Sequence, residues 1–142
     1  MSDDLAGPET TRGSCLCGAV SFEVAEPFEG VAQCHCTTCK RISGGTGTVS
    51  GRVRTEAINV LSGRERIRTY QPAEGTAKSF CSVCGSNLFG GGWPDSPMTT
   101  VRLSALDSPF DRRPEVHIFV RSIAPWETLP DDGAERREGL TQ

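Results

Sequence analysis

The sequence predicts a single, mainly β domain, and three observations indicate this fold class. The length of 142 residues suits one domain with a core of ordinary size. Glycine is frequent, with 16 residues, which favours many turns and short strands over long helices. Several short segments alternate apolar and polar residues, whereas no amphipathic pattern is long enough for a long helix.

The expected strands are short and follow one another along the chain. The first covers residues 19–24, in which Val20, Phe22 and Val24 share one face. After a turn, a second extended segment is expected at 31–36. The remaining strands are expected at 48–50, 58–61, 66–70, 79–80, 86–89, 98–103 and 116–120.

Seven cysteines fall into three tight clusters that have the spacing of metal ligands. Thiolates separated by one or two residues can bind one metal ion, and zinc is their usual partner. Four thiolates make a closed structural site, and the remaining three leave one coordination position open, as in a catalytic site. The expected cofactor is therefore zinc, at about two ions per chain. The clusters are Cys15-Leu16-Cys17, Cys34-His35-Cys36-Thr37-Thr38-Cys39 and Cys81-Ser82-Val83-Cys84.

Cys15, Cys17, Cys81 and Cys84 are predicted to form the closed structural site. Alternate side chains of an extended segment share a face, so Cys15 and Cys17 can both reach one metal ion. Cys81 and Cys84 followed by Gly85 are typical of a zinc knuckle, whose turn favours glycine. Such a site would tie the N-terminal strand to the middle of the chain and couple metal binding to folding.

Cys34, Cys36 and Cys39, the cysteine trio, are predicted to be catalytic and to hold the second zinc. All three lie within one short segment. His35 is a tempting fourth ligand, but in an extended segment it points away from Cys34 and Cys36, so a hydrogen-bonding or packing role is expected. His117, the other histidine, is expected to be a structural or pocket-wall residue.

Spacing alone is also compatible with a different pairing, in which members of the trio complete a site with Cys81 and Cys84 and leave Cys15 and Cys17 unused. An open three-thiolate zinc is a mild Lewis acid, because three anionic sulfurs already donate to it. It suits a soft ligand such as a thiolate, whose pKa it lowers. The inferred reaction class is thiol transfer to or from a small carbonyl compound.

Composition and charge argue against several classes of function. The formal net charge is −3, so a nucleic-acid partner is not expected. No stretch approaches the roughly 18 apolar residues of a membrane helix, so no membrane association is expected. The N-terminal segment is polar and acidic and lacks the apolar core of a signal peptide, which indicates a cytoplasmic location. In a reducing cytosol, clustered cysteines favour metal binding over disulfides.

Three regions are expected along the chain. Residues 1–12 are predicted to be a disordered lead, residues 13–128 a zinc-binding, mainly β domain, and residues 129–142 a mobile, acidic and charged tail. No internal repeat divides the domain, and the sequence leaves the oligomeric state open.

The three cysteine motifs, in this order, resemble those of the glutathione-dependent formaldehyde-activating enzyme family, which includes relatives of centromere protein V. The resemblance covers about residues 12–128, nearly the whole expected domain. It is specific because all three motifs occur together. The residues that carry it are Gly13–Val20, Cys34–Arg41 and Phe80–Ser86, with weaker echoes at Leu106-Asp107, His117–Val120 and Ala124–Trp126.

This resemblance implies a zinc-binding, mainly β fold like that of the Mss4 nucleotide-exchange chaperones. By position, Cys15, Cys17, Cys81 and Cys84 match the family's structural zinc ligands, and the trio matches its catalytic zinc ligands. The family's activity is formation of S-hydroxymethylglutathione from glutathione and formaldehyde, and the reverse cleavage. The resemblance therefore implies a carbon–sulfur lyase that acts on a small thiol such as glutathione.

Such a lyase needs a cationic pocket for the carboxylates of glutathione. Lys40 and Arg41, next to the trio, are candidates, and Arg52 and Arg54 are further candidates along the chain. For Arg52 and Arg54 individually, a solvated surface charge is the favoured interpretation. Trp93, in a glycine-rich loop, can either wall a pocket or pack. The competing hypothesis is a non-enzymatic zinc module, either a protein-interaction domain or a thiol redox sensor that uses the trio.

Overall fold

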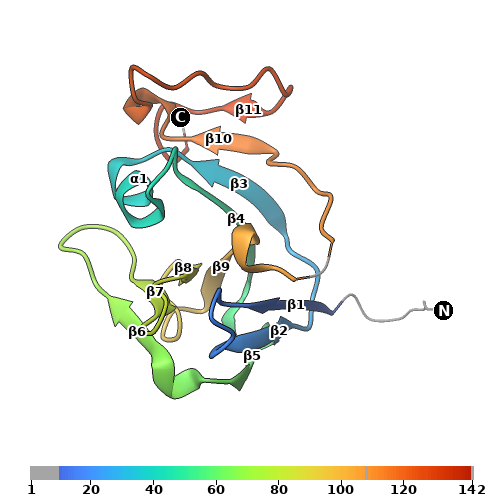
Figure 1. The fold of residues 1–142 in the computed structure, drawn as a ribbon. Helices are drawn as coiled ribbons and strands as arrows, with labels where there is room; N and C mark the ends of the chain where they lie inside the picture. The colour runs from blue at the N-terminus through green and yellow to red at the C-terminus, as the bar shows by residue number, and fades with distance from the viewer. Residues whose placement is uncertain (1–9, 108, 142) are drawn as a thin grey trace.

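The computed structural model describes residues 10–107 and 109–141, and among these the fold is mainly β, as predicted. Eleven strands of the described chain form two sheets, and its helices are short (Figure 1). The smaller sheet is antiparallel. In order across the sheet, its strands are β1 (Thr11–Ser14), β2 (Ser21–Val24) and β5 (Ile58–Ser62).

In order across the larger sheet, the strands are β11 (Glu135–Arg136), β10 (Val116–Ile118), β3 (Gly30–Cys34), β4 (Thr48–Arg54), β9 (Met98–Arg102), β8 (Asn87–Gly90), β7 (Lys78–Cys81) and β6 (Ile67–Tyr70). Neighbouring strands are antiparallel, except that β10 runs parallel to both β3 and β11. None of the described helices is long and apolar enough to cross a membrane. The described helices are α1 (Thr37–Ser43) and the 3-10 helices η1 (Thr55–Ala57), η2 (Arg64–Arg66), η3 (Leu103–Ala105) and η4 (Val120–Ser122).

The hydrophobic core lies between the two sheets. Phe22 of β2 packs edge-on against Phe89 of β8, with ring centroids 5.0 Å apart. Trp93, in the loop after β8, packs against the same Phe89 ring at 4.9 Å and is buried. Trp93 is therefore a core residue, which decides between the two roles that its loop left open. Other buried apolar side chains of this core are Val20, Val24, Val53, Leu88 and Val101.

Strand boundaries differ from the prediction where the backbone turns. The prediction extends the second segment to residue 36, whereas β3 ends at Cys34 and the unpredicted helix α1 begins at Thr37. The prediction also extends a strand over 116–120, whereas β10 ends at Ile118. The reason is Phe119, whose φ of 59° lies in the left-handed region and turns the chain out of the extended conformation.

The two ends of the domain also differ from the predicted boundaries. Most of the lead predicted at 1–12 lies outside the described residues, and β1 begins at Thr11. Within the segment predicted as a mobile tail at 129–142, the two residues of β11 pair with β10 of the larger sheet. Asp132 adds a 2.8 Å hydrogen bond between its Oδ2 and His117 Nε2. Polar composition suggested mobility, but backbone pairing does not require apolar side chains.

Candidate functional site

Two hairpin turns bring four cysteines together. Cys15 and Cys17 lie in the turn between β1 and β2, Cys81 ends β7, and Cys84 lies in the turn before β8. The prediction places Cys15 and Cys17 on an extended segment, whereas a 3.1 Å hydrogen bond from the Gly18 amide to the Cys15 carbonyl closes a turn there. Gly18 has a φ of 81°, which residues with a side chain rarely adopt.

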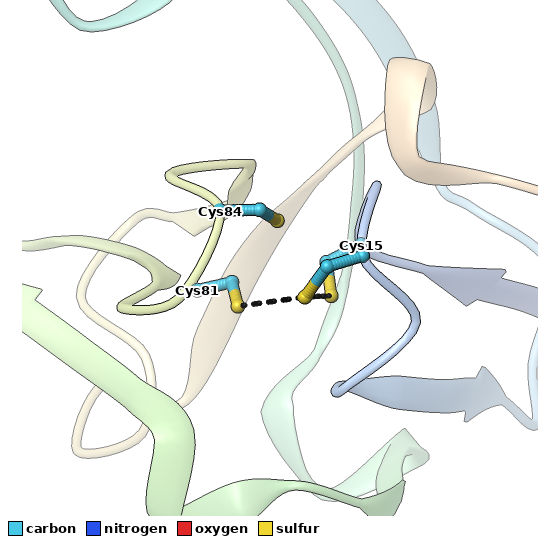
Figure 2. Close-up of side chains that lie close together, drawn as sticks. Cys15, Cys81 and Cys84 are labelled. Atoms are coloured by element: carbon cyan, nitrogen blue, oxygen red, sulfur yellow. Dashed lines mark hydrogen bonds between the residues drawn. The ribbon is translucent and has the colours of Figure 1, made fainter.

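The sulfurs of this four-cysteine cluster are close enough to hold one metal ion. All four Sγ atoms lie within 4.8 Å of one another. Cys15 Sγ is 3.6 Å from Cys17 Sγ, which is 3.9 Å from Cys81 Sγ. Figure 2 shows the Cys84 side chain pointing from its own turn toward Cys15. The structure therefore groups these cysteines together and apart from the trio.

Ser86 links the two turns and favours the ionised form of one cysteine. Its hydroxyl accepts a 2.9 Å hydrogen bond from the Leu16 amide. Hydrogen bonds from the Ser86 side chain, and then from its backbone, lower the pKa of Cys84 to about 5. A thiolate is the form of cysteine that binds metal, so this turn is prepared for a ligand role.

The cysteine trio is assembled by the end of a strand and the start of a helix. Cys34 ends β3, Cys36 caps the N-terminus of α1, and Cys39 lies in its first turn. The Cys39 amide donates to Cys36 Sγ at 3.3 Å, and the three sulfurs lie within 4.8 Å of one another, so they could hold a second metal ion. The usual capping residues are Ser, Thr, Asp and Asn, so a cysteine cap gives little sequence signal for the helix.

Negative charge is shared unevenly within the trio. Hydrogen bonds from the Cys34 and Cys39 thiols lower the pKa of Cys36 to about 2, and the contact with Cys36 raises the pKa of Cys34. Cys36 is thus the thiolate that its neighbours stabilise. Within the described part of the chain, neither Cys81 nor Cys84 joins these three, so the alternative pairing is not formed.

A cavity of about 300 Å³ lies beside the trio. Cys34 and Cys39 form part of its wall. Three cationic side chains also line it, namely Arg52 from β4, Lys78 from β7 and Arg102 from β9. A ligand that enters this cavity can therefore meet thiol groups and positive charge together.

Most of the cations predicted for the pocket lie elsewhere. Lys40 donates to a backbone carbonyl of the C-terminal segment, and Arg41 is exposed. Arg54 pairs with two surface glutamates. Among the described residues, the cavity wall includes none of Lys40, Arg41 and Arg54. It does include Arg52, for which a surface position was the favoured interpretation.

Sequence reasoning missed Lys78 and Arg102. Both lie in strands and are buried, with 8% and 4% of their surfaces exposed. A lone cation among apolar strand residues, as in Val101-Arg102-Leu103, is the signal that marks such a position. The pattern shows that the cation is unusual there, but not what it faces.

A chain of hydrogen bonds accounts for both histidines. His35 Nδ1 is 3.1 Å from Glu127 Oε2, His35 Nε2 is 2.9 Å from His117 Nδ1, and His117 Nε2 is 2.8 Å from Asp132 Oδ2. Both rings are fully buried, and this burial lowers the pKa of His35 although Glu127 opposes it. These hydrogen bonds join the residue after β3, and His117 of β10, to Glu127 and Asp132 near the C-terminus. His35 thus has a hydrogen-bonding role, which is one of the two roles expected from the sequence.

Asp132 gives this chain a testable pH dependence. A hydrogen bond from His117 lowers the pKa of the Asp132 carboxyl below its ordinary value of 3.8. A carboxyl with a lowered pKa stabilises the fold above its unfolded pKa, and that contribution is lost as pH falls through the folded value. Asp132→Asn is therefore expected to lower the free energy of unfolding at about pH 7, and the difference from the wild type should begin to narrow as pH falls below about 4.

Urea unfolding of both proteins across this pH range measures the difference. Asp131→Asn, at the neighbouring exposed position, is the matched control. A difference between wild type and Asp132→Asn that stays constant with pH would contradict the role given to this carboxylate.

Two comparisons with known proteins agree on the family. The family model described as glutathione-dependent formaldehyde-activating enzyme (GFA) matches residues 10–122. The chain belongs to this family. The match contains all seven cysteines and the three cationic residues of the cavity wall. The Mss4-like fold that the family implies agrees with the mainly β architecture.

Relatives show how far the similarity of this GFA chain extends. A Halomonas elongata protein with the provisional name glutathione-dependent formaldehyde-activating enzyme is 33% identical over 127 residues, which cover 81% of this chain and 78% of that protein. The crystal structure of a Rhodobacter sphaeroides protein has a TM-score of 0.57 and 24% identity. That likeness covers 70% of this chain and 91% of the other, and it concerns the fold alone.

Proposed function

We propose that this protein is a zinc-dependent carbon–sulfur lyase that forms or cleaves the adduct of glutathione with formaldehyde. The observation that carries the proposal is that two cysteines of the trio, Cys34 and Cys39, line a cavity whose wall also presents cations. A cavity of about 300 Å³ suits a small molecule, and the cations suit the carboxylates of glutathione. Membership of the GFA family supports the same pair of substrates.

The separations between the sulfurs fit zinc. In a tetrahedral site with zinc–sulfur bonds of about 2.3 Å, neighbouring sulfurs lie about 3.8 Å apart. The separations of 3.6 and 3.9 Å in the four-cysteine cluster are close to this value. In the proposal, this cluster holds a structural zinc through Cys15, Cys17, Cys81 and Cys84, and the trio holds a second zinc through Cys34, Cys36 and Cys39.

Zinc bound by the trio would supply a mild Lewis acid that favours the thiolate form of a bound thiol. The cations of the cavity wall hold the carboxylates of glutathione, so that its sulfur faces the trio and meets formaldehyde in a fixed orientation. The sulfur lone pair attacks the carbonyl carbon, and a carbon–sulfur bond forms as the thiol loses its proton. The π electrons of the carbonyl pass to its oxygen, which takes up a proton. Cleavage is the reverse of these steps.

NMR exchange spectroscopy with ¹³C-formaldehyde and glutathione tests this function. The adduct also forms without a catalyst, so the measured quantity is the rate of exchange between adduct and free formaldehyde. A catalytic amount of the zinc-loaded protein is expected to increase that rate with glutathione and much less with a small neutral thiol such as 2-mercaptoethanol. Exchange at the uncatalysed rate with glutathione would contradict the enzyme and favour a non-enzymatic zinc module or a thiol redox sensor.

A further inference from the structure

Two cations in the cavity wall are buried without a carboxylate partner. Lys78 is 8% exposed and Arg102 is 4% exposed. Within the described chain, neither side chain takes part in an ion pair. The cysteine trio supplies the nearest negative charge, because Lys78 helps to lower the pKa of Cys36 and the three cysteines oppose the lowering of the Arg102 pKa by burial. Zinc bound by three thiolates would leave one net negative charge for two buried cations, so the pair requires an explanation.

The hydrogen-bond partners of both cations are neutral. Among residues 10–107 and 109–141, Lys78 Nζ donates a single long bond of 3.3 Å, to the Thr76 hydroxyl. Arg102 Nη1 donates to the hydroxyls of Ser50 at 2.9 Å and Thr48 at 3.3 Å, and its Nε donates to the Asn87 side-chain carbonyl.

The last nitrogen of the guanidinium, Nη2 of Arg102, has no partner within the described chain although it is buried. Buried donors are almost always paired, so this unpaired donor leaves an unsatisfied positive charge just behind the cavity wall.

The two unsatisfied cations lie close to the same backbone position. Gly90 of β8 pairs with Thr100 of β9, and Phe89 pairs with Ser79, the residue after Lys78. A Cβ atom added to Gly90 would lie only 2.6 Å from Arg102 Nη2, so the guanidinium occupies the space beside this glycine. Lys78 and Arg102 therefore flank Gly90 from the two neighbouring strands.

The other charges at this cavity already have partners. Arg52 pairs with Glu29 at 3.2 Å, and both side chains are more than half exposed. Glu115 pairs with Arg112 at 2.7 Å. Lys78 and Arg102 are thus the cations of this cavity that lack a carboxylate partner within the described chain. They line the same wall as Cys34 and Cys39.

We propose that Lys78 and Arg102 form an anion subsite that receives a carboxylate of the thiol substrate. Lys78 makes the direct contact, and Arg102 adds a second positive charge beside it. The subsite selects thiols that carry a carboxylate over neutral thiols of similar size. The identity of the substrate rests on the proposed function, whereas the subsite itself rests on the two cations and the cavity.

Titration calorimetry with S-methylglutathione separates the subsite from catalysis, because this probe keeps both carboxylates and has no free thiol. Lys78→Met removes the charge at similar volume, and Lys78→Arg keeps it. Arg68→Met, which removes an exposed cation from the neighbouring strand β6, is the matched control. Lys78→Met is expected to weaken binding about 10- to 100-fold, whereas the other two variants should bind within about threefold of the wild type.

The diethyl ester of the same probe, which has no carboxylate, is expected to bind the wild type and Lys78→Met equally. Equal binding of the free acid to these two proteins would overturn the subsite. If the protein accelerates adduct exchange but binds the probe equally with and without the Lys78 charge, the lyase function is supported and the subsite is contradicted. If probe binding depends on Lys78 but the protein does not accelerate exchange, the subsite is supported and the lyase function is contradicted.

Discussion

The Cys17→Ser variant is expected to lose about 3 kcal/mol or more of its free energy of unfolding. Cys17 is exposed, and a surface substitution usually changes stability by less than about 0.5 kcal/mol. In the proposed structural zinc site, however, its thiolate is one of four ligands, and metal binding at such sites contributes about 10 kcal/mol or more to folding. A serine hydroxyl stays protonated at neutral pH and cannot replace the thiolate.

Urea unfolding of the variant and the wild type, at the same zinc concentration, measures this loss. Leu16→Ser, at the adjacent and 88% exposed position, is the matched control and should change stability by about 0.5 kcal/mol or less. A strong chelator added to the wild type is expected to reproduce the effect of Cys17→Ser. Equally small effects of the Cys17 and Leu16 substitutions would contradict a structural metal in the four-cysteine cluster.

The Cys36→Ser variant is expected to accelerate adduct exchange at least about 100-fold less than the wild type. Cys36 contributes a sulfur to the trio and also caps α1. Serine is a preferred capping residue, so the substitution removes the thiolate while the helix, and with it Cys39, keeps its support. The expected loss therefore reports the chemistry of the trio rather than the folding of α1.

The exchange rate of each variant, measured beside its circular dichroism spectrum, checks this result. Thr38→Ser, between Cys36 and Cys39 but outside the trio, is the control and should keep the wild-type rate. Cys36→Ala removes the thiolate and the cap together, so it should lose activity equally and stability more. A Cys36→Ser protein with the full rate would show that the trio is not the reaction centre.

The chemistry of the site is easier to predict from the sequence than its architecture. The three cysteine motifs follow from separations of one or two residues, which are local properties. Spacing left open which motifs combine at one site, and the structure decides between the two groupings. The contact between His35 and His117 joins residues 82 positions apart and depends on the parallel pairing of β3 with β10. A local pattern does not specify which distant strands become neighbours, so this contact required the structure.

The helix α1 and the cationic wall of the cavity show two further limits. A seven-residue helix capped by Cys36 has neither the usual capping residue nor a long amphipathic pattern. Lys78 and Arg102 occupy strand positions where a charged side chain usually faces solvent, and only the order of β7, β8 and β9 places them at one cavity. The mainly β class, by contrast, follows from frequent glycine and short alternating segments.

Elemental analysis of zinc per chain, in protein purified without chelator, tests the two metal centres most directly. About two zinc ions per wild-type chain, and about one per Cys36→Ser chain, are predicted, because the substitution removes a ligand only from the trio. About one zinc ion in both proteins would contradict the arrangement, because the four-cysteine cluster alone would then account for the metal.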